Sequence, residues 1–251
     1  MLCEPEGGCW CAELPNKMPL PDPGAGCLCR ACLTKQLGPH LNLWKKALGS
    51  VPAWVWERTD LETLVLADNK LSEISDQIGR LRNLRMLDLG HNQLTRVPDT
   101  LADLHALTDF LYLHDNQLPS LPDAFAQLTR LRYLNISENA FETFPTCIFS
   151  MTGLYELRAS GNRLASLPDS IERLTRLREL HLRDNQLTSL PDSIGSLHEL
   201  RQIDLRGNPL KRLPDVIAAL PRLEKLDLRW ADIAPYDWFA DLEARGCLVY
   251  R

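Results

Sequence analysis

The sequence contains no apolar run long enough to cross a membrane, and its first residues, MLCEPEGGCW, lack the basic start and apolar core of a secretory signal. Positive charge is not in excess, because 28 Lys and Arg stand against 33 Asp and Glu, for a formal net charge of −5. This balance argues against general electrostatic binding to nucleic acid or to an anionic membrane. We therefore expect a cytoplasmic, monomeric protein that binds neither nucleic acid nor membrane.

Sequence patterns of the common enzyme classes are also missing. The patterns G-x-x-x-x-G-K-[ST], G-x-G-x-x-G, G-x-S-x-G and H-E-x-x-H do not occur. His91 and His114 fall on neighbouring predicted strands near Asp88 and Asp115, where an acid–base or metal site could form. Polar side chains that simply line a surface are the simpler interpretation, so we predict a protein that is not an enzyme.

Cysteine is scarce except at the start of the chain. Six of the eight cysteines lie in the first 32 residues, at Cys3, Cys9, Cys11, Cys27, Cys29 and Cys32. Two cysteine groups separated by a short proline-rich stretch resemble the ligand layout of a structural zinc site, and thiolates are preferred Zn²⁺ ligands. We predict a small irregular module over residues 1–37, with Zn as the candidate ion and these six cysteines as its ligands. Redox or disulfide chemistry and a degenerate remnant are the alternatives. Cys147 and Cys247 are interpreted as buried packing thiols.

The remainder, residues 38–251, repeats one pattern. The segments LETLVLADNKL, LRMLDLGHNQL, LRELHLRDNQL and LRQIDLRGNPL share the frame L-x-x-L-x-L-x-x-N-x-L. About nine units follow one another at 23-residue steps, except for a step of 24 from Leu107 to Leu131. Leucines alternating with polar residues predict half-buried strands, which are too short to be stable unless neighbouring units stack. The extra residue predicts a bulge just before the strand of its unit.

Two further columns follow this frame. An asparagine recurs at Asn69, Asn92, Asn116, Asn139, Asn162, Asn185 and Asn208, where a buried amide can bond the backbone of adjacent turns. A proline follows six of these asparagines and ends the strand geometry, at Pro98, Pro122, Pro145, Pro168, Pro191 and Pro214. The later apolar spacing of three suits a short 3₁₀ segment. At the C-terminus, we predict that Trp238, Phe239 and Leu242 cover the open end and that CLVY forms a final strand.

The repeated frame resembles the leucine-rich repeat family. The segments LPDSIERLTR, LPDSIGSLHE and LPDVIAALPR resemble its 23-residue LPxxIxxL subtype, found in bacterial and plant intracellular proteins. This resemblance implies an α/β solenoid, a right-handed horseshoe with a parallel sheet on its concave face. In the head, CWCAELP and CLCRACL resemble the bacterial cysteine-rich CWC family.

The function that this fold favours is a protein–protein interaction scaffold with the partner on the concave face. The alternatives are a zinc-dependent or redox-sensing head that the repeats localise, and a secreted bacterial effector. Strand alternation selects the side chains that point into the concavity. The predicted partner-binding residues are Met86, Asp88, Phe110, Tyr112, His114, Tyr133, Asn135, Arg158, His181, Arg183, Arg206 and Arg229.

Two groups stand out within this set. Phe110, Tyr112 and Tyr133 should be neighbours on adjacent strands, and exposed aromatic side chains are typical interface anchors. The column of Arg183, Arg206 and Arg229 runs beside three aspartates, Asp184, Asp204 and Asp227. A self-neutralising lattice is the simpler interpretation of this column, and tuning of the partner's orientation and association rate is the alternative.

Overall fold

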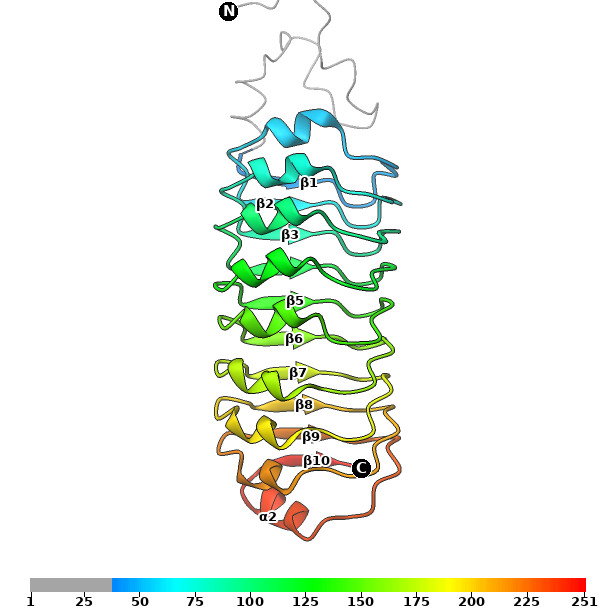
Figure 1. Cartoon of the computed structure of the whole chain (residues 1–251), viewed down its shortest axis with the longest axis vertical. Coiled ribbons are helices and arrows are strands. Elements are labelled where there is room, and N and C mark those ends of the chain that lie inside the picture. The colour runs from blue at the N-terminus through cyan, green and yellow to red at the C-terminus, as the bar shows by residue number, and fades with distance from the viewer. Residues whose placement is uncertain (1–37) are drawn as a thin grey trace, which may run out of the picture.

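Each repeat contributes one three-residue strand to a single parallel sheet, in which every strand pairs with the strands of the units before and after it (Figure 1). The computed structural model describes residues 38–251. The strands are His40–Asn42 (β1), Thr63–Val65 (β2), Met86–Asp88 (β3), Phe110–Tyr112 (β4), Tyr133–Asn135 (β5), Glu156–Arg158 (β6), Glu179–His181 (β7), Gln202–Asp204 (β8), Lys225–Asp227 (β9) and Leu248–Tyr250 (β10). The prediction of a parallel repeat sheet is confirmed. The predicted zinc module at residues 1–37 lies outside the described residues and stays a prediction.

The strands alternate between buried and partly exposed residues, as the leucine pattern predicts. The middle residue is fully or almost fully buried in β1 to β9, whereas the first residue of each of these strands is half-buried or exposed. The leucines of all units therefore merge into one continuous core that runs the length of the solenoid. Because a strand of three residues has little stability by itself, this core is what holds each strand in place.

The extra residue is absorbed immediately before β4. The Asp109 N–H donates to the Arg85 carbonyl at 3.0 Å, while the Arg132 N–H donates to the Thr108 carbonyl at 3.0 Å. Thr108 and Asp109 together thus take the place that one residue holds in the other units, which is the defining feature of a bulge. The register of β4 is unaffected, since Phe110 pairs with Met86 on one side and Tyr133 on the other.

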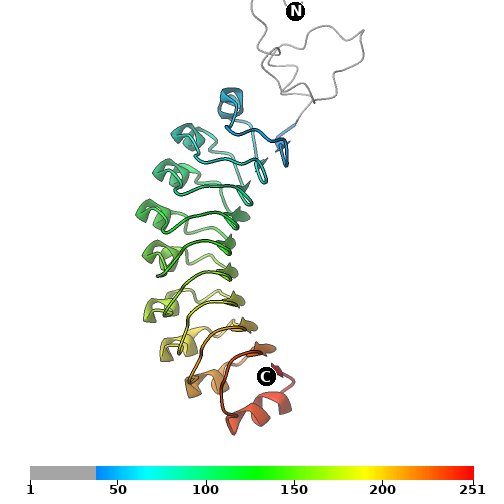
Figure 2. The same cartoon turned by 90° about the vertical axis from the view of Figure 1, so that its right-hand side faces the viewer.

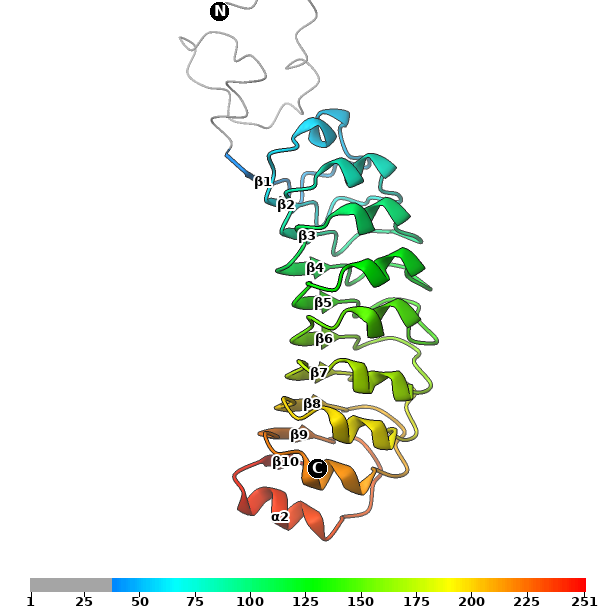
Figure 3. The same ribbon diagram turned by 60° about the vertical axis from the view of Figure 1, so that its left-hand side comes forward.

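Short 3₁₀ helices form the outer side of the arch, and the strands line its inner side (Figures 2 and 3). Their bounds are Ala53–Glu57 (η2), Asp76–Arg80 (η3), Asp99–Asp103 (η4), Asp123–Gln127 (η5), Thr146–Ser150 (η6), Asp169–Arg173 (η7), Asp192–Ser196 (η8) and Asp215–Ala219 (η9). A proline precedes all of them except η3, where Ser75 caps the helix and accepts a hydrogen bond from Gln77. Proline suits this place because its fixed φ is compatible with the first turn and its missing N–H is not needed there.

The asparagines form the predicted ladder. The Asn162 amide nitrogen donates to the carbonyls of Ile136 at 3.0 Å and Ala159 at 3.2 Å, and its oxygen accepts from the Phe141 N–H at 3.2 Å. One side chain therefore satisfies backbone groups in two successive turns, and equivalent bonds recur along the ladder. Such groups would otherwise be buried without partners, which is costly.

A left-handed residue comes directly before each of the seven ladder asparagines, and before Lys46 and Ala231, which hold the equivalent positions in the terminal units. These residues are Lys45, Asp68, His91, Asp115, Glu138, Gly161, Asp184, Gly207 and Trp230, with φ between 51° and 66°. Only two of the nine are glycine, although this region of backbone space is uncommon for other residues. The ladder hydrogen bonds stabilise a turn that the residue types alone would not predict.

The C-terminal end is capped as predicted, by the helix Trp238–Ala244 (α2), which buries Phe239 and Leu242. The Trp238 and Phe239 ring centroids lie 4.6 Å apart, and β10 follows the helix. Cys247 and Cys147 are both buried, which raises the pKa of each thiol, that of Cys147 to about 11. The prediction that they are packing thiols is therefore confirmed. Within residues 38–251, no helix has the length and apolar character needed to cross a membrane.

Candidate functional site

The concave face is built from the first and third residues of each strand, because the middle residue points into the core. Eight of the twelve predicted residues occupy these positions. They are Met86, Asp88, Phe110, Tyr112, Tyr133, Asn135, Arg158 and His181. The other four, His114, Arg183, Arg206 and Arg229, lie two residues beyond the ends of their strands. Phe110 is exposed and the other eleven are half-buried, so all twelve retain surface on or beside this face.

Phe110, Tyr112 and Tyr133 form one aromatic cluster on β4 and β5. The Tyr133 ring centroid lies 5.0 Å from that of Tyr112 and 5.4 Å from that of Phe110, and the Phe110 and Tyr112 rings stack at 5.9 Å. Burial raises the pKa of Tyr112 and raises that of Tyr133 to about 12, so both phenols are neutral at physiological pH. The predicted neighbourhood of these three rings is confirmed, and Phe110 keeps 42% of its surface exposed.

A hydrogen-bonded histidine pair continues from this aromatic cluster. The His91 and His114 Nε2 atoms lie 3.2 Å apart, and the His91 Nδ1 lies 2.6 Å from an Asp115 carboxylate oxygen. Partial burial lowers the pKa of His114, and the electrostatic effect of the neighbouring His91 lowers it further. The His114 ring covers Gly90, where a Cβ atom would come within 2.3 Å of it. These residues are brought together as predicted, in an arrangement of polar groups that line the surface.

Two glutamates that the sequence analysis did not single out lie in the middle of the face. The His181 Nε2 is 3.1 Å from a Glu179 oxygen and 3.8 Å from a Glu156 oxygen. Their ligand atoms lie within 4.8 Å of one another, close enough to hold a divalent cation. Arg158 also bonds Glu156, so ion pairing with Arg158 and His181 already accounts for this arrangement. The signal in the sequence was their shared position in adjacent repeats.

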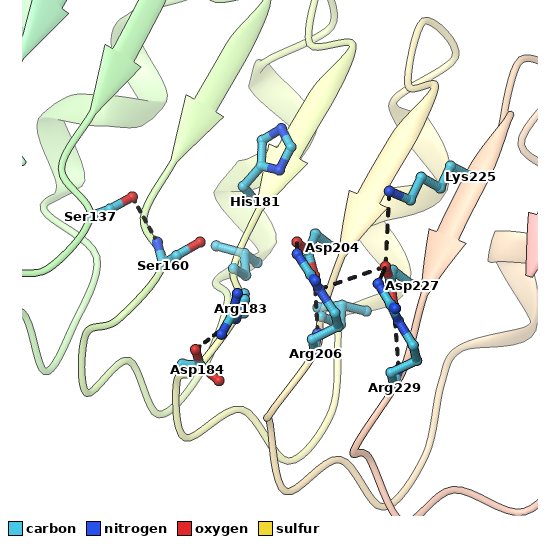
Figure 4. A network of polar contacts seen from close by, with 12 residues as sticks. Ser137, Ser160, His181, Arg183, Asp184, Asp204, Arg206, Lys225, Asp227 and Arg229 are labelled. Atoms are coloured by element: carbon cyan, nitrogen blue, oxygen red, sulfur yellow. Dashed lines mark hydrogen bonds and ion pairs between the residues drawn. The ribbon is translucent and has the colours of Figure 1, made fainter. Parts of the chain in front are cut away.

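The C-terminal part of the face carries an ion-pair lattice made of Asp204, Arg206, Lys225, Asp227 and Arg229 (Figure 4). Arg206 bonds Asp204 through two nitrogens, at 2.6 and 2.8 Å, and Arg229 bonds Asp227 in the same way at 2.8 and 2.9 Å. Arg206 and Lys225 also approach the Asp227 carboxylate, at 3.6 and 3.9 Å. Paired guanidinium and carboxylate groups of this kind neutralise one another, as the simpler interpretation of this column predicted.

Burial is unequal within the lattice. The Asp227 side chain is completely buried, and Asp204 is 8% exposed. Burial by itself would raise the pKa of Asp204, but hydrogen bonds from the Arg206 side chain and backbone outweigh it and lower the pKa. At the border of the lattice, Arg183 pairs with the exposed Asp184 at 2.7 Å.

Trp230 is an exposed residue that the sequence analysis missed. It retains 70% of its surface, and the guanidinium groups of Arg183 and Arg229 lie 5.7 and 5.8 Å from its ring. Its position is the left-handed one before the ladder, which Gly207 holds in the preceding unit. A tryptophan at a position otherwise held by small, charged or histidine side chains was the signal that could have identified it.

The comparisons with known proteins agree on one architecture. A family model described as "Leucine rich repeat" matches residues 59–118, 111–164 and 175–233. Fibromodulin of Oryctolagus cuniculus is 33% identical over 113 residues, which cover 42% of this chain and 75% of that protein. The protein flightless-1 homolog of Caenorhabditis elegans is 33% identical over 105 residues, which cover 41% of this chain and 8% of that protein.

Solved structures extend the likeness over most of the chain. An internalin of Listeria monocytogenes is 25% identical with a TM-score of 0.75, covering 88% of this chain and 62% of its own. The LRR protein LIC12759 of Leptospira interrogans is 26% identical with a TM-score of 0.69, covering 83% of this chain and 64% of its own. This chain therefore spans somewhat less than two thirds of those solved chains.

Proposed function

The chain belongs to the leucine-rich repeat family, and we propose that it is a non-catalytic scaffold that binds a protein partner on its concave face. Proteins of this family generally mediate protein–protein interaction. The plant receptor ectodomain GASSHO1/SCHENGEN3 of Arabidopsis thaliana, solved in complex with CASPARIAN STRIP INTEGRITY FACTOR 2, is 30% identical with a TM-score of 0.62, covering 80% of this chain and 28% of its own. A cytoplasmic location and Zn binding by the head cysteines are further proposals about the same protein.

The aromatic cluster carries this proposal. Its three rings contact one another on adjacent strands, so their positions are fixed before any partner arrives. A group that is already ordered loses little conformational entropy on binding, and aromatic side chains dominate the free energy of many interfaces. Phe110 supplies the most exposed apolar surface of the three.

The polar part of the face has a different role in the proposal. The charges around Arg183, Arg206 and Arg229 already have partners within the chain. They can orient an approaching protein and change its association rate, but they have little unpaired charge left to add to the affinity. The partner's main contacts are therefore expected on β4 and β5.

The test is affinity capture with the full chain, followed by measurement of Kd for each captured protein. Changing Tyr112 and Tyr133 together to alanine should weaken binding by tenfold or more, about 1.4 kcal/mol or above. Glu172→Lys, on the outer side in η7, is the matched control and should leave Kd unchanged. A partner that tolerates the double tyrosine change and loses affinity with Glu172→Lys would place the interface on the outer side.

A further inference from the structure

An open hollow of about 410 Å³ lies at the edge of the sheet where the middle strands begin. Four arginines line it, namely Arg85, Arg130, Arg132 and Arg176. Other residues of the wall include Tyr155 and the bulge residues Thr108 and Asp109. Its size is in the range of small-ligand sites, which is roughly 300–1,000 Å³.

The repeat explains why a hollow forms at this place. Arg130, Gly153 and Arg176 precede the first leucine of three successive units, so they stack in one column. Gly153 has no side chain, which leaves a gap between the two arginines. A Cβ at Gly153 would lie 2.6 Å from the Thr129 carbonyl oxygen, so the close approach of the preceding unit requires glycine here.

A second column borders the same gap. Arg132, Tyr155 and Arg178 each follow the first leucine of their units. The Arg178 guanidinium lies 4.8 Å from the centroid of the Tyr155 ring, which fixes this ring at the wall of the hollow. The gap is thus flanked by arginines from the units on both sides of it.

The charge in the hollow is not balanced. Arg85 pairs with Asp109 at 3.1 Å, but the side chains of Arg130, Arg132 and Arg176 have no ion pair or hydrogen bond with any residue in the part of the chain that the structure describes. Elsewhere along the same edge, Arg201 pairs with Glu224 and Arg222 with Glu199. Three positive charges therefore face one hollow in a chain whose net charge is −5.

We propose that this hollow binds a phosphate ester. A phosphomonoester carries a charge of about −1.5 to −2 at pH 7 and three acceptor oxygens, which matches several guanidinium groups better than a single carboxylate does. Arginine forks bind such oxygens in pairs. The ester can belong to a small phosphorylated molecule or to a phosphorylated side chain of a protein, and the binding chemistry is the same for both.

The site is independent of the concave-face proposal, although the two are adjacent. Arg132 directly precedes Tyr133, and Asp109 directly precedes Phe110. A protein on the aromatic cluster can therefore also extend a phosphorylated side chain into the hollow. A free phosphorylated molecule would bind whether or not a protein occupies the concave face.

Calorimetric titration of the full chain tests the proposal with two probes, ribose 5-phosphate and the peptide acetyl-Gly-phosphoserine-Gly-amide. The double change Arg130→Gln with Arg176→Gln should weaken binding of the preferred probe at least tenfold. Arg163→Gln with Arg212→Gln removes the same charge at two exposed arginines outside the hollow and should change binding less than twofold. All four arginines are exposed, so the circular dichroism spectra should match that of the wild type.

Tighter binding of ribose 5-phosphate would identify a free ligand, and tighter binding of the peptide would identify a protein-borne phosphate. Binding of neither probe at millimolar concentration would overturn the proposal. Equal weakening by the two double variants would also overturn it, because the attraction would then be a general effect of charge. Tyr112→Ala with Tyr133→Ala should leave probe binding intact, which separates this test from that of the concave face.

Discussion

Strands β3 to β5 and strands β7 to β9 have the same length, register and leucine core, yet they present opposite kinds of surface. The first group carries stacked aromatic rings with Phe110 exposed, whereas the second carries arginines and aspartates that are paired with one another. The apolar surface can still gain free energy by burial against a partner, at roughly 25 cal/mol per Å². The paired charges already interact within the chain, so a partner adds little further electrostatic free energy. A repeat fold fixes the residues that point into the core and leaves the residues on the concave face free to differ in this way.

The first prediction tests whether the ion-pair lattice stabilises the fold. Asp227→Ala removes a buried carboxylate that faces Arg206, Lys225 and Arg229. The three cations would then repel one another, so the free energy of unfolding should fall by about 2–4 kcal/mol, near the cost of breaking a buried ion pair and reduced because Arg229 is 40% exposed. Urea denaturation measures this change.

Asp88→Ala is the matched control in strands β3 to β5, which carry the aromatic cluster. Asp88 holds the same strand position, but it is half-buried and accepts one hydrogen bond, from the Gly90 N–H at 2.9 Å. Its loss should cost about 1 kcal/mol. An equal loss of unfolding free energy for the two substitutions would remove the proposed difference between β3 to β5 and β7 to β9.

The second prediction concerns the asparagine ladder, which the two groups of strands share. Asn116 and Asn185 are both buried, and each donates to three carbonyls and accepts one backbone N–H. Changing either to leucine leaves these backbone groups unpaired, and each change should lower the free energy of unfolding by about 1–3 kcal/mol. The two values should agree closely. Ser170→Ala, on the outer side, should change stability very little, and an effect as large as that of Asn185→Leu would contradict the role of the ladder.

The third and smallest effect is the contribution of His114 to the pH dependence of stability. Partial burial and His91 lower the folded-state pKa of His114, so the unfolded chain takes up this proton first as the pH falls. His114 should therefore reduce stability progressively below about pH 6.5, the ordinary histidine pKa, until the folded-state pKa has been passed. In urea denaturation at pH 7.5 and pH 5.5, His114→Asn should lose less stability between the two pH values than the wild type. The same loss in both proteins would show that His114 is not linked to folding.

The predictions from sequence were right where the spacing of the repeat contains the whole cause. The strand Tyr133–Asn135 follows from its own leucine alternation, and η7 follows from Pro168 and the buried Ile171. The bulge before β4 could be placed because one added residue must be absorbed outside the strand spacing that all the repeats share. The neighbourhood of Phe110 and Tyr133 followed as well, because parallel strands in a fixed register set their distance.

The sequence by itself therefore determined the solenoid, the asparagine ladder, and which strand residues point into the core or onto the concave face. All of these depend on spacing within and between equivalent units. Only the tertiary structure decided the complete burial of Asp227, the contact of Trp230 with Arg183, and the hollow between Arg130 and Arg176. Each of these arises from side chains in different repeats, whose sizes and directions the frame leaves open. Their combined shape and charge exist only once the units are stacked, because stacking is what places those side chains against one another.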